Sequence, residues 1–127
     1  MNGPRVMIVE DEFLIRLTLA EALSDEGFDV VEATTGDEAL TILRGNPDIA
    51  LLLTDIQLPG QLDGYALARA ARQHVPGIPV IFTTGRPDNS GNEATGPGDV
   101  FIAKTYLPSE VCKTARRLVS SAASSPN

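Results

Sequence analysis

The sequence predicts a protein of the α/β class, in which helices cover both faces of a doubly wound parallel sheet of five strands. Strand-like and helix-like segments alternate five times along the 127 residues, as expected for repeated strand–helix–strand units. The strand-like segments are apolar throughout and do not alternate between apolar and polar residues. This pattern is typical of strands that are buried on both faces of a parallel sheet.

Each strand is predicted from a short run of apolar, often β-branched residues. The predicted strands are residues 5–10, 29–34, 49–54, 78–84 and 99–103. Helices are predicted between them where apolar residues recur at helical spacing, as Ile15, Leu19, Ala22 and Leu23 do in the first. The predicted helices lie within residues 11–27, 34–45, 63–73 and 107–120.

Residues 85–99 interrupt the alternation at the place where a fourth of about five helices belongs. Glycine and proline supply six of these fifteen residues, and both residues are poor helix formers. The sequence therefore predicts a fourth helix that is short or irregular.

Length, charge and cysteine content limit the class of protein. The chain is long enough for one domain, which we place at residues 1–120, followed by a frayed tail at residues 121–127. A net charge of −7 argues against direct binding to nucleic acid or to an anionic membrane. No apolar run approaches the roughly 20 residues of a membrane span, and a signal peptide is not expected. A single cysteine, Cys112, favours the reducing cytoplasm.

Polar side chains follow four of the five predicted strands. Glu10 and Asp11 come at the end of the first strand, Asp55 at the end of the third, Thr84 at the end of the fourth and Lys104 after the fifth. The carboxyl ends of parallel strands meet at one edge of the sheet, where ligands bind in doubly wound folds. We therefore expect these five side chains to lie close together.

The residue types at this edge indicate chemistry with a metal ion and a phosphoryl group. Three neighbouring carboxylates repel one another unless a cation holds them. Oxygen ligands without histidine or cysteine favour a hard ion, above all Mg²⁺, with Mn²⁺ or Ca²⁺ as substitutes in vitro. Lys104 and Thr84 offer a positive charge and a hydroxyl to a phosphoryl group. Asp55 can then act as the nucleophile and form an aspartyl phosphate.

Four motifs in this order resemble the response-regulator receiver domain of bacterial two-component signalling over essentially the whole chain. They are VEDE after the first strand, LLLTDIQLPG at the third, VIFTTG at the fourth and FIAK at the fifth. The fourth strand is similar to that of stand-alone receivers whose strand ends in Phe-x-Thr-Gly. The resemblance implies a flavodoxin-like fold.

The resemblance also implies a role for each site residue. Asp55 would be the phosphoacceptor. Asp11 would bind Mg²⁺, with Glu10 as its acidic neighbour and the backbone carbonyl of Gln57 completing the protein's share of the ligands. These four residues form the expected metal and phosphorylation site.

Three further residues would respond to phosphorylation. Lys104 would pair with the phosphoryl group, and Thr84 would move its hydroxyl towards it. Phe101 would follow as an aromatic switch; packing in the core is the alternative interpretation of this side chain.

Three features depart from the family pattern, the first being the weak fourth helix after FTTG described above. The loop LPGQLDG after the phosphoacceptor has one residue more than is usual. Thr105 follows Lys104 where most receivers have a proline in a cis peptide. A cis peptide without proline costs about 3–4 kcal/mol, so we expect a trans peptide between Lys104 and Thr105.

The first predicted helix carries more apolar residues than one buried face needs. Phe13, Leu14 and Leu17 lie off its main stripe. Partial burial against the last helix is one interpretation. Docking to the helical stem of a histidine kinase through Leu14 and Leu17, as the resemblance implies, is the other.

These observations favour a single-domain response regulator and not an enzyme acting on other substrates. Only 23 residues follow Lys104, so no output domain is expected. The expected partners are a sensor histidine kinase or phosphotransfer protein and a downstream protein, with Asp55 as phosphate carrier or sink. A receiver that no longer accepts phosphate is the main alternative. An aspartyl-phosphate phosphatase is disfavoured because Gln57 stands where such enzymes need a carboxylate. A flavodoxin-like binding module is disfavoured because the acidic segment VEDEFL would repel a phosphate.

Overall fold

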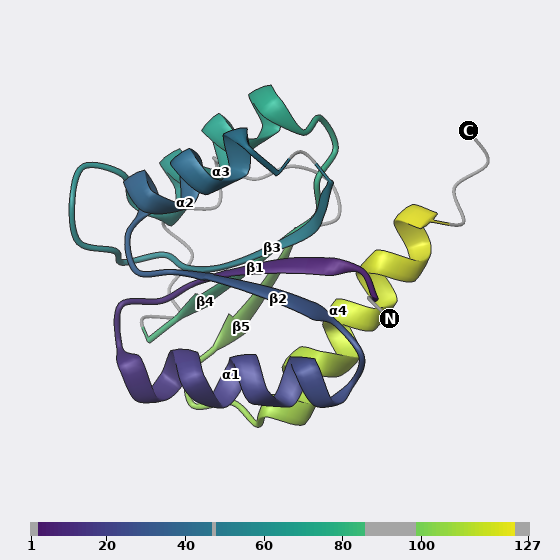
Figure 1. The fold of residues 1–127 in the computed structure, drawn as a ribbon. Helices are drawn as coiled ribbons and strands as arrows, with labels where there is room; N and C mark the ends of the chain where they lie inside the picture. The colour runs from purple at the N-terminus through teal and green to yellow at the C-terminus, as the bar shows by residue number, and fades with distance from the viewer. Residues whose placement is uncertain (1–2, 47, 86–98, 124–127) are drawn as a thin grey trace.

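The computed structural model describes residues 3–46, 48–85 and 99–123 of the chain. Within these ranges the predicted α/β architecture is confirmed, with one sheet between two layers of helices (Figure 1). The expected short or irregular fourth helix falls on residues 86–98 and lies outside the described residues.

Five parallel strands form the sheet in the order β2-β1-β3-β4-β5. Each strand lies within one or two residues of its predicted bounds. The strands are β1 (Arg5–Val9), β2 (Asp29–Ala33), β3 (Ile49–Asp55), β4 (Val80–Thr84) and β5 (Val100–Ala103). In this order β3 and β1 lie in the interior and β5 at an edge, so the strand that precedes Lys104 pairs with β4 alone in the described part of the chain.

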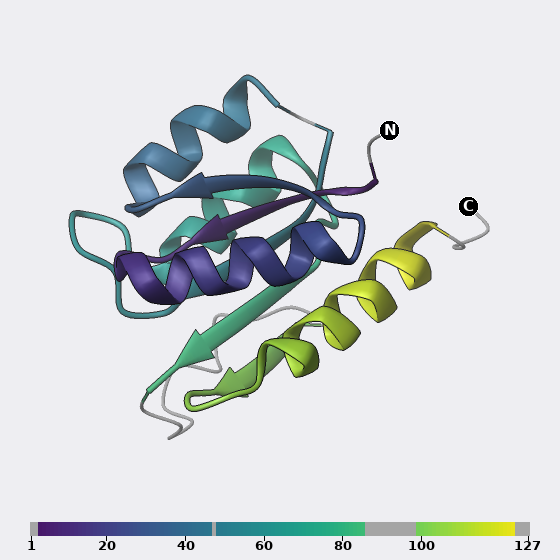
Figure 2. The ribbon, with the colours of Figure 1, turned by 60° about the horizontal axis from the view of Figure 1, so that its bottom comes forward.

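Four helices are seen in the described residues, and they cover the sheet in pairs. They are α1 (Phe13–Asp25), α2 (Gly36–Arg44), α3 (Gly64–His74) and α4 (Pro108–Ala123). Helices α2 and α3 lie on one face of the sheet and α1 and α4 on the other (Figures 1 and 2). This arrangement buries both faces of the strands, as their apolar sequences predicted.

The core is therefore divided into two layers by the sheet. Met7 and Val9 of β1 pack with α2 and α3, whereas Val6 and Ile8 of the same strand pack with α1 and α4. Successive side chains of a strand point to opposite faces, which is why every residue in this run is apolar.

Capping side chains fix where the helices on the first face begin. The Thr35 hydroxyl accepts a hydrogen bond from the backbone N–H of Glu38 at 3.0 Å, and the Glu38 carboxylate accepts from the N–H of Thr34 at 2.8 Å. The Asp63 carboxylate accepts from the N–H of Ala66 at 2.8 Å and starts α3. Such caps satisfy amide groups that a helix leaves unpaired at its N-terminus.

None of the helices in the described part of the chain has the length and apolarity needed to span a bilayer.

Candidate functional site

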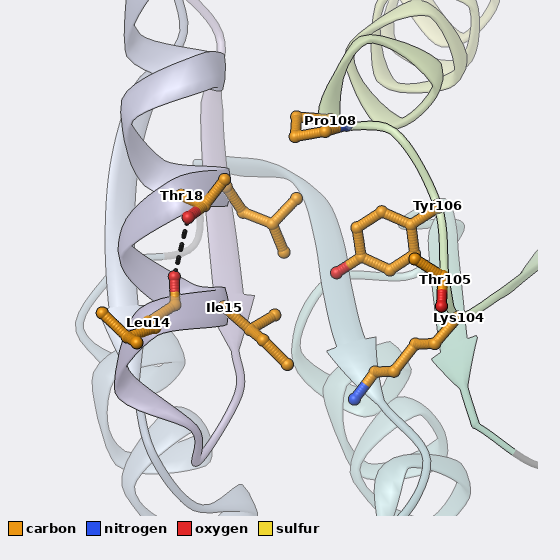
Figure 3. A pocket seen from close by; sticks show the side chains of 8 residues that line it. Leu14, Ile15, Thr18, Lys104, Thr105, Tyr106 and Pro108 are labelled. Carbon is orange, nitrogen blue, oxygen red and sulfur yellow. Dashed lines mark hydrogen bonds between the residues drawn. The ribbon is translucent and has the colours of Figure 1, made fainter.

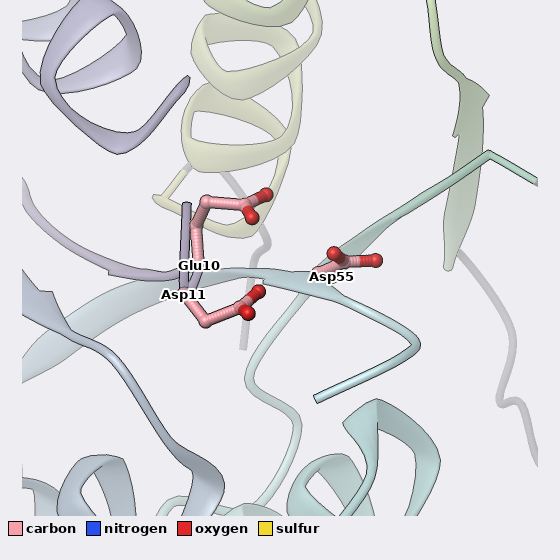
Figure 4. Close-up of side chains that lie close together, drawn as sticks. All are labelled: Glu10, Asp11 and Asp55. Atoms are coloured by element: carbon pink, nitrogen blue, oxygen red, sulfur yellow. The ribbon is translucent and has the colours of Figure 1, made fainter. Parts of the chain in front are cut away.

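The carboxyl edge of the sheet brings together the polar residues that end its strands. Glu10 and Asp11 follow β1, and Asp55 ends β3 (Figure 4). Glu10 is only 2% exposed and Asp55 only 6%, although carboxylates are rarely buried without partners. The predicted convergence of the three carboxylates is confirmed, since one oxygen from each lies within 4.8 Å of the others.

Lys104 bridges two of these carboxylates. Its Nζ lies 3.0 Å from Oδ2 of Asp55 and 3.3 Å from Oε1 of Glu10. Its backbone N–H also donates to the carbonyl of Thr84 at 2.8 Å. Lys104 is thus held at both ends, by the sheet and by the carboxylates.

The peptide between Lys104 and Thr105 is cis. The trans peptide expected from the sequence is therefore wrong. The backbone bond and the two ion pairs of Lys104 fix the position of this residue, so the site and not the preference of an isolated peptide sets its conformation.

The charges at the site influence one another. Burial raises the pKa of Glu10, and the hydrogen bond from the backbone N–H of Glu12 and the charge of Lys104 only partly oppose this effect. For Lys104, burial alone would lower the pKa, but the hydrogen bond to Asp55 and the charges of Glu10 and Asp55 outweigh it and raise the pKa. The lysine therefore stays charged between two acidic groups.

The carboxylate cluster suits a small hard cation. Glu10, Asp11 and Asp55 offer oxygen atoms only, the ligand type that Mg²⁺ prefers. With Mg–O distances of about 2.1 Å, oxygens on opposite sides of the ion lie about 4.2 Å apart, which the 4.8 Å cluster accommodates. Gln57 is placed beside this cluster, because its backbone N–H donates to Oδ1 of Asp55 at 3.3 Å.

Thr84 and Phe101 occupy different environments. Thr84 is 4% exposed, and its hydroxyl lies 3.5 Å from Oε1 of Gln57. Phe101 is 41% exposed, with its ring stacked on Phe82 at 5.0 Å and 6.3 Å from the ring of Tyr65. Phe101 is thus packed on one side and open on the other, and its role as a switch stays a prediction.

Sequence reasoning missed two residues that shape the site. Gly64 follows the loop after Asp55, and a Cβ built on it would lie 2.4 Å from the Asp55 carbonyl oxygen. Its N–H donates to the carbonyl of Ile56 at 2.8 Å. The signal for Gly64 was present in the sequence, as a glycine directly after the helix cap Asp63. Tyr106, the second missed residue, places a buried hydroxyl near Lys104.

One of the exposed apolar residues of α1, Leu14, lines a groove. Phe13 is 60% exposed, Leu14 71% and Leu17 37%, so all three side chains are partly buried and Leu17 the most. The groove, of about 340 Å³, lies between α1 and the segment that joins β5 to α4 (Figure 3). Leu14 and Lys104 therefore line the same groove, and Lys104 joins this groove to the carboxylate cluster.

A family model described as "Response regulator receiver domain" matches residues 6–116. The chain belongs to this family. The receiver domain is a phosphoryl-accepting signalling module, and the buried aspartate at the end of β3 with its lysine and acidic neighbours agrees with that class.

Comparison with individual proteins also finds similarity to response regulators and their receiver domains. The chain is 41% identical over 123 residues to the Aerobic respiration control protein ArcA of Escherichia coli strain K12, covering 94% of this chain and 50% of ArcA. Among solved structures, the receiver domain from Hybrid Histidine Kinase CckA is 31% identical with a TM-score of 0.79, covering 91% of this chain and 98% of that one. A response regulator receiver protein from Sinorhizobium medicae WSM419 shares the fold, with a TM-score of 0.87 at 23% identity and coverage of 93% and 95%. The chain spans about half the length of the curated relatives it matches.

Proposed function

We propose that this receiver accepts a phosphoryl group on Asp55 from the phosphohistidine of a sensor histidine kinase or phosphotransfer protein. An Asp55 carboxylate oxygen would form the new bond to phosphorus while the bond from phosphorus to the donor imidazole nitrogen breaks. The imidazole nitrogen keeps the electron pair and takes up a proton. The observation that carries the proposal is the contact of 3.0 Å between Lys104 Nζ and the Asp55 carboxylate at the edge of the acidic cluster.

Mg²⁺ would neutralise charge on the transferred phosphoryl group. The residues that would hold it are Glu10, Asp11 and Asp55, with the backbone carbonyl of Gln57. Lys104 would turn its ammonium from Asp55 Oδ2 to the phosphoryl oxygens, which carry more negative charge.

Phosphorylation would then change the surface beside β5. The Thr84 hydroxyl would leave Gln57 for a phosphoryl oxygen, which is the stronger acceptor. Phe101 would turn inward into the space that Thr84 vacates. The movement of this exposed ring would signal through contact with a downstream protein. A cytoplasmic location, inferred from the single cysteine, belongs to the same proposal.

Intact mass after incubation with acetyl phosphate and Mg²⁺ tests the chemistry. The wild-type chain should gain one phosphoryl group, Asp55→Asn should gain none, and removal of Mg²⁺ with a chelator should abolish the gain. Asp48→Asn is a matched control, because this exposed aspartate precedes β3 at the opposite edge of the sheet. A wild type that never gains mass would favour a receiver that acts without phosphorylation.

We also propose that Leu14 and Leu17 contact the kinase. Their side chains are 71% and 37% exposed, so replacing both with alanine removes mainly the buried part of Leu17 and should lower the free energy of unfolding by only about 1 kcal/mol. Phosphotransfer from a purified kinase that labels the wild type should slow, while labelling by acetyl phosphate should not. An equal fall with both donors would place the effect on folding or on Asp55 itself.

A further inference from the structure

Arg16 lies in the first turn of α1, and the proposed reaction gives it no role. Side chains of a helix lean towards its N-terminus, so the guanidinium reaches back over the turn between β1 and α1. Its Nη1 donates to the backbone carbonyl of Glu10 at 2.9 Å, and its Nε donates to Oε1 of Glu32 on β2 at 3.0 Å. The Arg16 side chain is only 14% exposed. Arg16 therefore joins α1, the end of β1 and β2 at the carboxyl edge of the sheet.

The carbonyl that Arg16 binds belongs to the peptide between Glu10 and Asp11. These residues supply two of the three carboxylates in the cluster, and Figure 4 shows both carboxylates turned towards Asp55. A peptide unit is planar, so a bond that fixes its carbonyl restrains the whole unit, including the Cα atoms at its two ends. The hydrogen bond from Arg16 thus acts on the backbone that carries both carboxylates.

The turn between β1 and α1 is held differently from those that precede α2 and α3. Capping side chains start α2 and α3, whereas Glu12 at the start of α1 makes no side-chain capping bond. The N–H of Glu10 donates to the Ala33 carbonyl of β2 at 3.1 Å, and Arg16 binds the carbonyl of the same residue. Arg16 therefore gives this turn a side-chain restraint that a cap gives the other two.

The bond from Arg16 does not compete with a cation, because it ends on a backbone atom and not on a carboxylate. Neighbouring carboxylates repel one another, so a turn that is free to move would separate Glu10 and Asp11 from Asp55 when no cation is present. A restrained turn keeps the three groups together and reduces the ordering that binding requires. Replacing a residue that orients metal ligands changes metal affinity by about 10- to 100-fold.

We propose that Arg16 is a positioning residue of the cation site, which holds the Glu10–Asp11 peptide so that both carboxylates stay beside Asp55 before a divalent cation binds. Glu32 fixes the guanidinium in turn. The inference rests on the proposed function, because the cation is the one that the proposed phosphoryl transfer requires. Arg16 itself contacts neither the cation nor the phosphoryl group.

Binding of Mn²⁺ without a phosphodonor tests the inference. Electron paramagnetic resonance follows the sharp signal of free Mn²⁺, which is lost on binding, and gives the Kd. Arg16→Met removes both hydrogen bonds, and Arg16→Lys keeps the charge but not the forked donor geometry. Arg5→Met is the matched control, because Arg5 pairs with Asp29 at 2.9 Å and joins the same two strands at the opposite edge of the sheet.

We expect Arg16→Met to raise the Kd for Mn²⁺ by roughly tenfold and Arg5→Met to leave it at the wild-type value. Arg16→Lys should behave more like Arg16→Met than like the wild type, because one ammonium cannot hold both partners in the same geometry. Asp11→Asn removes a ligand and shows the loss expected when the cluster itself fails. Urea unfolding of each variant confirms that the chain is folded under the assay conditions.

Three results would overturn the inference. The first is a wild-type Kd in folded Arg16→Met, and the second is full affinity in Arg16→Lys, which would assign the effect to charge and not to hydrogen bonding. The third is an equal loss of affinity in Arg5→Met, which would assign it to stability. Loss of binding in Asp11→Asn alone would keep the proposed cation site and reject the role of Arg16. If the wild type binds no Mn²⁺, or Asp11→Asn binds it equally well, the proposed cation site fails and the inference fails with it.

Discussion

Replacing Gly64 by alanine should disturb the proposed phosphoacceptor, Asp55, without changing any charged side chain. The new Cβ would lie 2.4 Å from the Asp55 carbonyl oxygen and 2.8 Å from the Cα of Ile56. To reach an ordinary contact distance near 3.4 Å, the new Cβ and the Asp55 carbonyl oxygen must move apart by about 1 Å. The carbonyl oxygen and the Cα of Ile56 are backbone atoms and cannot rotate away as a side chain could. Overpacking of this kind costs about 1–3 kcal/mol of unfolding free energy. A shift of about 1 Å at a reacting group can slow a reaction by about 100-fold.

Urea unfolding and the rate of labelling by acetyl phosphate measure the two effects of Gly64→Ala. Gly45→Ala is the matched control, since Gly45 also borders a helix but its added Cβ would meet only the Ile42 carbonyl oxygen at 3.7 Å, with φ at −94°. We expect Gly45→Ala to keep the wild-type labelling rate and to match or exceed its stability. Equal behaviour of the two variants would refute the close approach of α3 to Asp55.

Three further predictions concern groups away from the phosphoryl transfer itself. Arg72→Met should lower the free energy of unfolding in urea by about 3 kcal/mol, because the ion pair joins Arg72 to an Asp99 side chain that is 1% exposed; a change within error would contradict this. Cys112 should react with iodoacetamide at pH 8 only after unfolding, since burial raises the pKa of its thiol; rapid labelling of the native chain would show an accessible thiolate. Tyr106 has its pKa raised from 10.0 to about 12 by burial, so the unfolded state loses this proton first and the stabilisation is lost as pH rises from about 10 to 12. The wild type should lose about 2 kcal/mol more than Tyr106→Phe over that range, and parallel pH curves would contradict the raised pKa.

The fold could be predicted because its determinants are local. The apolar runs that became β1 and β3 are buried on both faces, and a glycine or capping residue marks most helix ends. The site followed from topology, since parallel strands bring Glu10, Asp55 and Lys104 to one edge wherever the intervening helices lie.

Features that depend on distances between residues far apart in the sequence could not be predicted from local patterns or from strand order. Neither the bridge from Lys104 to Glu10 as well as to Asp55 nor the cis peptide between Lys104 and Thr105 could be predicted from local sequence patterns. The hydroxyl that distinguishes Tyr106 from a phenylalanine is visible in the sequence, but its burial without a partner is not. Helical periodicity placed Leu14 off the buried stripe of α1 and could not say whether another element covers it.

The position and type of the phosphoryl bond test the central claim most directly. An acyl phosphate on an aspartate is reduced by borohydride to homoserine, which peptide mass mapping locates to a single residue. After incubation with acetyl phosphate and Mg²⁺, we predict this conversion at residue 55 and at no other carboxylate. Conversion at another residue, or a gain in mass that borohydride leaves in place, would contradict the assignment of Asp55 as the phosphoacceptor.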